Sequence, residues 1–205
     1  MNIVDKSREK LLLYETRHQT ILNNAILIFN SKGYKAATTA AIAKESDISE
    51  PILYKHFKNK KELFLACFQS ITMHLTAEYR KIFKKYKDDE ITCLEEICRA
   101  YFDFVDQNPD RSMFLVHMLS YKDDPDFNAA FETTVQKHTG SIEKILQSAV
   151  SKGKIDKDLN LNFVSAFFCH QYFSMVGMKE TLGEKDFKYE YYFAIIKKLL
   201  DYPGR

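Results

Sequence analysis

Apolar side chains recur along most of this chain at the spacing of a helix rather than that of a strand. Between residues 17 and 31 the apolar positions fall on one helical face, and they are Ile21, Leu22, Ala25, Ile26 and Phe29. Gly33 follows, as glycine often does just past a helix end. Alternation with a period of two is nowhere sustained, so no strand is predicted. We therefore predict an all-α fold of about nine helices.

The longest predicted helix runs from near residue 60 to residue 87 without proline or glycine. Such a helix is expected to be rigid and to join the N-terminal part of the chain to the helices that follow. Further helices are predicted between breaks at proline, glycine and acidic pairs, at 90–107, 110–121, 126–152, 159–181 and 186–201. Residues 1–15 form a polar extension around a short apolar run at 11–14, for which a helix is one reading.

Residues 33–57 contain two short predicted helices and a tight turn. Thr38 or Thr39 caps the first helix, and the turn occupies residues 46–49. Asp47 stands where glycine would be easiest, but aspartate tolerates the left-handed conformation better than most residues. Ser49 caps the second helix, and Pro51 lies in its first turn, where a missing N–H costs little. Two helices and a turn of this length predict a helix-turn-helix.

Two segments near the end of the chain are apolar around the whole helix. They are 163–178 and 186–201. A helix that is apolar all round is buried on more than one side. The sequence therefore predicts a homodimer joined by a four-helix bundle, and the side chains expected at the dimer interface are Phe168, Tyr172, Met175, Tyr192, Ile196 and Leu199.

Composition and charge fit a folded chain with a basic N-terminal part. The 205 residues are 45% hydrophobic and 28% charged, with a net charge of +2. Residues 1–62 carry 11 basic and 7 acidic side chains, and the remainder carries 19 and 21. A basic first domain suits nucleic acid. No apolar run is long enough to span a bilayer and the start lacks a signal-peptide core, so we expect a cytoplasmic protein without a membrane partner.

Catalytic and metal-binding patterns are missing from the sequence. Cys67, Cys93, Cys98 and Cys169 lack C-x-x-C spacing and are expected to act as small core residues. Cys169 and His170 are adjacent, and adjacent helical residues point in different directions. No glycine-rich phosphate loop or zinc spacing occurs. We therefore expect a protein that is not an enzyme and has no metal site and no cofactor.

Side chains that could bind DNA gather in and around the second short helix. Base edges would face its first turn, and phosphates would meet its hydroxyl and basic groups. The candidate DNA contacts are Thr38, Thr39, Ser49, Glu50, Pro51, Ile52, Tyr54, Lys55, His56, Lys58 and Lys60. An ordinary amphipathic segment with solvated charges is the alternative interpretation of these residues.

The spacing of residues 17–64 resembles the N-terminal domain of the tetracycline-repressor (TetR/AcrR) family of transcriptional regulators. The matching positions are Arg17, Ile21, Leu22, Ala25, Phe29, Gly33, Tyr34, Thr38, Thr39, Ile42, Ala43, Ile48, Ser49, Leu53, Tyr54, His56, Phe57, Lys60 and Leu63. The resemblance implies a three-helix helix-turn-helix DNA-binding domain at 1–60 and a helical ligand-binding and dimerisation domain at 61–205. It also implies phosphate contacts at Thr39, Tyr54, His56 and Lys60. Ser46-Asp47 and Pro51 depart from the glycines common there, so the operator is not predictable.

The second predicted domain is rich in aromatic residues with a few polar groups among them, as expected for a pocket that binds an apolar ligand. The candidate ligand-binding residues are Phe64, Phe68, Tyr101, Phe102, Val105, Phe114, His117, Met118, Tyr121, Phe167, His170, Gln171 and Ser174. Simple core packing is the alternative for each of them, because large apolar side chains are usually interior.

The sequence thus predicts a ligand-responsive transcriptional regulator. Its expected partners are a palindromic double-stranded DNA operator, a second copy of itself and a small apolar or amphipathic effector that releases a repressor from DNA. The alternative is a regulator of the same fold that is controlled by a protein partner or acts as an activator.

Overall fold

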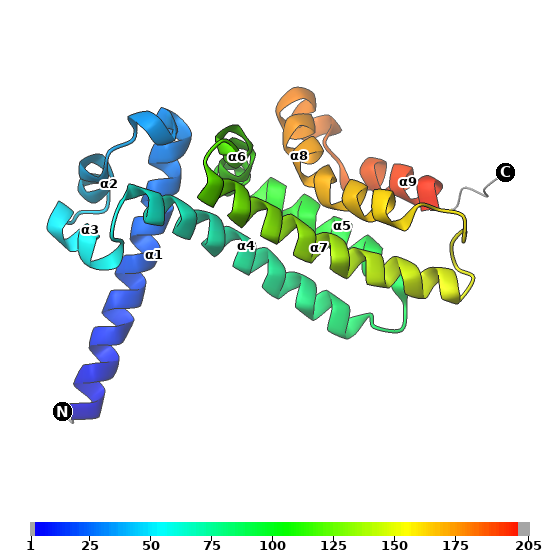
Figure 1. The fold of residues 1–205 in the computed structure, drawn as a ribbon, viewed down its shortest axis with the longest axis horizontal. Helices are drawn as coiled ribbons and strands as arrows, with labels where there is room; N and C mark the ends of the chain where they lie inside the picture. The colour runs from blue at the N-terminus through cyan, green and yellow to red at the C-terminus, as the bar shows by residue number, and fades with distance from the viewer. Residues whose placement is uncertain (1–2, 201–205) are drawn as a thin grey trace.

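The computed structural model describes the backbone of residues 3–200 and the side chains of 8–9, 11–183 and 185–198 (Figure 1). Its helices are α1 (Ile3–Ala36), α2 (Thr39–Glu45), α3 (Glu50–His56), α4 (Lys60–Lys85), α5 (Glu90–Gln107), α6 (Pro109–Met118), the 3-10 helix η1 (Leu119–Tyr121), α7 (Pro125–Ser151), α8 (Leu161–Asp186) and α9 (Tyr189–Leu200). Within the described residues there is no strand, which confirms the all-α prediction.

Helix α1 is longer than the helix predicted at 17–31. It already begins at Ile3, and its first turns project away from the remainder of the molecule (Figure 1). Leu11, Leu12 and Leu13 are each more than half exposed, so this part of α1 has no core to pack on. The buried stripe begins at Ile21, as the apolar pattern indicated.

The helix-turn-helix forms with the predicted turn. Thr38 caps α2, since its hydroxyl accepts the Ala41 N–H at 3.2 Å. Asp47 takes the left-handed conformation with φ 53°, as expected from its place in the turn. Ser49 occupies the cap position of α3 but its side chain makes no cap hydrogen bond, so this hydroxyl stays exposed. Leu53 and Phe57 face inward and are buried.

A cluster of aromatic rings joins the head, which consists of α1–α3, to the body, which consists of α4–α9. Phe64, in the first turns of α4, lies at its centre with 1% exposure. Ring centroids lie 4.8–5.5 Å from that of Phe64, and the rings belong to Phe29 and Tyr34 of α1, Phe114 of α6, Tyr121 of η1 and Phe127 of α7. Because one ring contacts elements from both parts, head and body share a single core.

Polar contacts fix the same junction. Gly33 leaves the helical conformation with φ 73°, and the Tyr34 N–H beside it donates to the Tyr121 hydroxyl at 2.9 Å. The Lys60 ammonium donates to the carbonyl oxygens of Tyr34 at 2.8 Å, Lys35 at 3.2 Å and Ala37 at 2.9 Å. These are carbonyls at the C-terminal end of α1, where a cation is favoured.

The body consists of α4–α9, with α5 in contact with α4, α7, α8 and α9. Helices α7 and α8 pack along each other. Phe102 of α5 stacks on Phe187 with centroids 4.4 Å apart, which holds the connection into α9 against the body. The predicted breaks near residues 88, 108, 124 and 153 match the observed helix ends closely, because proline, glycine and capping aspartate act locally.

The predicted dimer residues lie largely inside one chain. Phe168, Tyr172, Met175 and Ile196 are 0–4% exposed, and Tyr192 is half-buried. The side chain of Leu199 lies outside the described residues. The predicted dimer interface stays a prediction, and these four side chains pack within one chain, because an apolar pattern around the whole helix does not tell which side meets the chain's own core. The exposed face of α8 instead carries Phe163, Phe167, His170 and Ser174.

A buried carboxylate ties α5 to the end of α7. Glu90 is 3% exposed; its Oε1 accepts hydrogen bonds from Ser148 at 2.6 Å and Lys152 at 2.5 Å, and its Oε2 accepts from Lys154 at 2.8 Å. These bonds, from Lys152 first and then Lys154 and Ser148, hold the pKa of Glu90 well below its usual range.

Replacing the Tyr121 hydroxyl should destabilise the junction. In Tyr121→Phe the half-buried Tyr34 N–H loses its acceptor, and we expect the free energy of unfolding to fall by about 1–2 kcal/mol in chemical denaturation. Tyr191→Phe is the matched control, because Tyr191 is 61% exposed. Equal denaturation midpoints for the two variants would contradict the role of this hydrogen bond.

Glu90 should make the stability of the protein depend on pH in the acidic range. Its pKa is lowered by folding, so its contribution is complete above pH 4.5, the ordinary pKa, and declines as pH falls toward the folded-state pKa. Glu90→Gln should lower stability at pH 7 and flatten the loss of stability below pH 4.5, as measured by urea denaturation across pH. Glu15→Gln, at an exposed position of α1, should preserve the wild-type pH profile.

Candidate nucleic-acid interface and interior cavity

The exposed side of α3 carries the side chains expected to meet DNA. Pro51, Tyr54 and Lys55 are exposed, Ile52 is half-buried, and Thr38 and Ser49 are exposed at the starts of α2 and α3. Helices α2 and α3 lie at the opposite end of the molecule from α8 and α9 (Figure 1). The exposed residues of the two short helices therefore lie away from α8 and α9.

Thr39, Glu50 and Tyr54 form a hydrogen-bonded group on this surface. The Thr39 hydroxyl donates to Glu50 Oε1 and lies 3.1 Å from the Tyr54 hydroxyl, which is itself 3.5 Å from Glu50 Oε1. The group brings α2 and α3 together at the point where the predicted phosphate contacts lie. A phosphate reaching Thr39 and Tyr54 must replace the Glu50 carboxylate as their acceptor.

His56 lies under the extended part of α1. Its ring stacks on Tyr14 with centroids 4.2 Å apart, and His18 stacks on Phe57 at 4.6 Å. Burial, followed by the neighbouring His18 and Arg17, lowers the pKa of His56. Its Nδ1 is buried without a hydrogen-bond partner among the described residues. A neutral, stacked ring is a weaker phosphate ligand than the sequence suggested.

Lys60 has a different role from the predicted one. All three N–H donors of an ammonium are matched by the three carbonyl oxygens of residues 34, 35 and 37. The Lys60 side chain thus links the start of α4 to the end of α1, and its three N–H donors are occupied rather than free for a phosphate. Lys55 and Lys58 remain exposed beside α3, and the Lys58 backbone N–H donates to Glu62 Oε2 at 2.8 Å.

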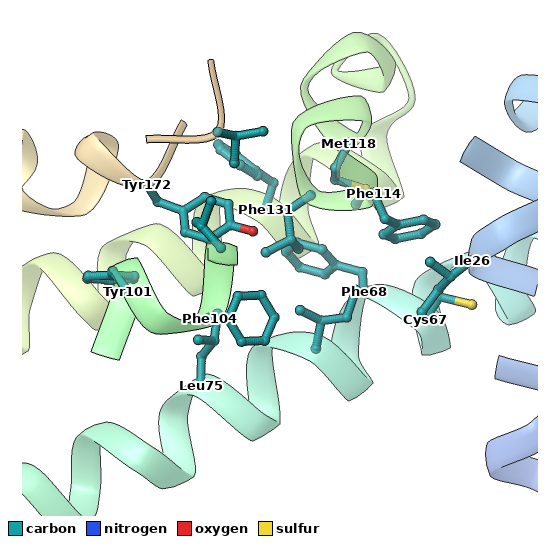
Figure 2. Packing of buried hydrophobic residues seen from close by; sticks show 14 of the residues in the cluster. Ile26, Cys67, Phe68, Leu75, Tyr101, Phe104, Phe114, Met118, Phe131 and Tyr172 are labelled. Carbon is teal, nitrogen blue, oxygen red and sulfur yellow. The ribbon is translucent and has the colours of Figure 1, made fainter. Parts of the chain in front are cut away.

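The body contains a partly open cavity between α4, α5 and α7. It has a volume of about 210 Å³ and is lined by Thr76, Tyr79, Arg80, Phe83, Ile97, Tyr101, Lys137, His138, Ser141 and Ile142. A smaller hollow of about 60 Å³ shares Tyr101 and His138 with it and reaches α8. Figure 2 shows Phe68 and Leu75 of α4, Phe131 of α7 and Tyr172 of α8, which line this second hollow, converging on one another. The two spaces are therefore neighbours in one aromatic interior.

Buried hydroxyl groups in this interior could make a further hydrogen bond. Tyr79 and Tyr172 are each 4% exposed, and neither hydroxyl makes a hydrogen bond of normal geometry among the described residues, although Tyr101 lies beside the first and Ser112 beside the second. Burial raises the pKa of both, so both are protonated and can donate. His138 Nε2 lies 3.2 Å from the Thr76 hydroxyl, and burial, then Lys137, lowers its pKa. A buried hydroxyl without a partner is costly, and a ligand's polar atom would satisfy it.

Among the predicted ligand-binding residues, Phe68 and Tyr101 line this interior. Phe64, Phe114 and Tyr121 instead form the junction cluster, and Phe102 packs on Phe187. Val105, Met118 and Gln171 are buried away from the lining, and His117 is half-buried. Phe167, His170 and Ser174 lie on the exposed face of α8. Aromatic composition alone does not distinguish a cavity wall from a solid core.

Several lining residues were missed. Tyr172 is among the predicted dimer residues, and His138 lies on the helix predicted at 126–152 without being predicted as a site residue. The signal available in the sequence was the polar His138 among Phe131, Val135 and Ile142 on one helical face. A titratable group on an apolar stripe needs a polar partner, here Thr76.

The fold and the surface define a class, the helix-turn-helix DNA-binding regulators with a helical body. The family model described as "Bacterial regulatory proteins, tetR family" matches residues 21–67, which span α1 from the start of its buried stripe through α2 and α3 into α4. Among the described residues, no helix has the length and apolar content to cross a membrane.

Known proteins agree with this class over most of the chain. The transposon Tn10 TetC protein of Escherichia coli is 23% identical over 175 residues, 84% of this chain and 86% of TetC. The HTH-type transcriptional activator FasR of Mycolicibacterium smegmatis is 27% identical over 62% of this chain and 58% of FasR. The transcriptional regulator FadR from Bacillus subtilis, solved in complex with stearoyl-CoA, superposes with a TM-score of 0.74 at 13% identity, covering 91% of this chain and 99% of FadR. The chain therefore carries a TetR-family DNA-binding domain at residues 21–67, and its body has the fold of TetR-family structures.

An exposed basic residue of α3 should contribute to DNA affinity without regard to sequence. Lys55→Gln should weaken binding to operator and scrambled duplexes by a similar factor and reduce the slope of log affinity against log salt by about 0.9. Lys81→Gln, on α4 and 72% exposed, removes the same charge away from α3 and should leave the slope unchanged. Fluorescence anisotropy over a salt series makes the measurement, and an unaltered slope in Lys55→Gln would count against a phosphate contact there.

Proposed function

We propose that this protein is a ligand-responsive transcriptional repressor of the cytoplasm that binds a palindromic operator as a homodimer and is released by a small apolar or amphipathic effector. The proposal rests most heavily on one observation, the cavity of the body, whose largely apolar walls include two buried tyrosine hydroxyls that make no hydrogen bond of normal geometry among the described residues. A cavity that has apolar walls and a few polar groups suits a small organic molecule.

The DNA-binding domain is residues 1–60 and the effector and dimerisation domain is residues 61–205 in this proposal. Thr39, Ser49, Tyr54, Lys55 and Lys58 bind phosphates, and Pro51 and Ile52 meet base edges. Glu50 orients Thr39 and Tyr54 until a phosphate takes its place. His56 and Lys60 hold these residues in place through their contacts with α1.

Helix α4 couples the effector to DNA. Thr72 and Thr76 of α4 line the interior, while Lys60 and Phe64 at its start are attached to α1. A ligand that shifts α4 therefore moves the head as well. In a dimer the two recognition helices must be about 34–36 Å apart to enter successive major grooves. Release follows when that separation changes.

A dimer would use the exposed faces of α8 and α9 rather than the buried residues named from the sequence. Phe163 is 70% exposed and Phe167 40%, and Tyr191 and Ile195 of α9 are each 61% exposed. Large exposed apolar side chains on neighbouring helices are typical of an association surface. Two helices from each copy would again give a four-helix arrangement.

The alternative is a regulator of the same fold that acts as an activator or answers to a protein partner. The similarity to FasR, described as a transcriptional activator, is the observation in its favour. Loss of DNA binding when a small molecule stabilises the protein separates the two proposals, since an activator of this kind would hold its site.

Filling the cavity should make the protein insensitive to its effector. Val135 lines the interior, and Val135→Phe should abolish ligand-induced thermal stabilisation and ligand-induced release in a gel shift, while DNA affinity stays near wild type. The added ring costs about 1–3 kcal/mol of stability if the wall cannot adjust.

Gln136→Phe is the matched control for this variant, because it places the same ring at the next, exposed position of α7. Release of DNA by the same ligand from both variants would show that the effector binds elsewhere.

A further inference from the structure

A third hollow extends the interior to the surface of the body. It has a volume of about 320 Å³ and lies where the end of α4 and the start of α5 meet α7. It shares Phe83 and Ser141 with the 210 Å³ cavity, which in turn shares Tyr101 and His138 with the innermost hollow. The three spaces therefore form a row, from an open mouth to the aromatic centre of the body.

Basic side chains surround the outer part of this row. Lys87 and Lys144 line the mouth, and Arg80 and Lys137 line the next cavity. Lys87 lies 3.6 Å from Asp88, but both side chains are at least 75% exposed, and such a surface pair is weak. Arg80, Lys137 and Lys144 have no carboxylate within 4.0 Å among the described residues.

The one carboxylate in the lining, that of Glu90, already has two lysine partners. Both oxygens of Glu90 accept hydrogen bonds, from Lys152, Lys154 and Ser148. The two lysines lie outside the lining of the mouth, so they balance Glu90 without using Lys87 or Lys144. Lys87 and Lys144 therefore remain available at the mouth, where Glu90 and Asp89 are the carboxylates that act on Cys93.

The inner end of the row is apolar and carries no fixed charge. Its walls include Phe68, Leu75, Leu115, Phe131 and Phe173, and its titratable side chains are neutral near pH 7. Placing an ionised group there would be costly, whereas a hydrocarbon chain would be favoured.

We propose that the effector is an anionic amphiphile with a single alkyl chain, whose chain fills the inner cavities and whose carboxylate or phosphate head binds at the mouth between Lys87 and Lys144. This inference rests on the proposed effector function and adds the charge, the orientation and the entry point of the ligand. A cationic amphiphile of the same size would meet four like charges.

Calorimetry with a matched set of ligands on the full chain tests the charge. Dodecanoate, dodecyl phosphate, dodecanol and dodecyltrimethylammonium share one chain and differ in the head. We expect the two anions to bind about tenfold tighter than the alcohol, and the cation to bind most weakly. The tighter anion identifies the head as carboxylate or phosphate. Shortening the chain by one methylene should weaken binding about fourfold.

Charge reversal at the mouth tests the position of the head. Lys87→Glu combined with Lys144→Glu should remove the preference for dodecanoate over dodecanol and leave dodecanol binding unchanged, which also reports that the cavity is intact. Lys81→Glu combined with Lys84→Glu is the control, because it changes the charge equally at exposed positions of α4 outside the lining.

The outcomes distinguish a failure of this inference from a failure of the proposed effector function. Equal binding of anion, alcohol and cation, or an unchanged anion preference in the mouth variant, overturns the proposed head site while the effector function stands. Failure of every amphiphile to bind or to release DNA contradicts the effector function itself, and the inference with it.

Discussion

The position of the DNA-binding head depends on the first turn of α4. There the Lys60 ammonium donates to three carbonyl oxygens at the end of α1, and the Phe64 ring lies among five others from α1, α6, η1 and α7. Carbonyls at a helix C-terminus lack partners within the helix, so a cation from another element satisfies them and opposes the helix dipole. Through this contact, the orientation of α2 and α3 follows that of α4. A change in α4 is consequently a change in the surface offered to DNA.

The same helix also borders the cavities of the body. Beyond the junction, α4 lines the cavities of the body through Phe68, Thr72, Thr76 and Tyr79, and Lys87 of the basic mouth follows two residues after its end. Its lack of proline and glycine means that a displacement in the body is transmitted along the rod rather than absorbed in a bend. The buried hydroxyls of Tyr79 and Tyr172 leave polar capacity inside, while the charges remain outside. Apolar walls, neutral donors inside and cations at the entrance together describe a site for a long, polarised molecule.

Much of the fold followed from the sequence because its signals are local. Caps, turns and breaks such as Thr38, Asp47 and Pro109 act within a few residues, and the helices begin and end near the predicted positions. The predicted site was less accurate. Phe64, Phe114 and Tyr121 have the composition of a pocket wall but form a solid cluster, and Lys60 is basic but engaged. Whether a side chain lines a cavity or fills a core depends on its neighbours from other helices, which periodicity does not identify.

By itself, the sequence determined the helical class, the helix-turn-helix and the resemblance to the TetR family, since each of these depends on the spacing of residues close together in the chain. It also determined which face of α1 and of α4 is apolar. The tertiary structure decided which aromatic residues meet at the junction, which leave a cavity, and which side of α8 stays exposed. Residues 163–178 illustrate the difference, since nearly every position is apolar and every face is equally suited to burial. Packing against α7 and α5 covers Phe168, Tyr172 and Met175 and leaves Phe163 and Phe167 outside, because a helix can turn only one side toward its own core.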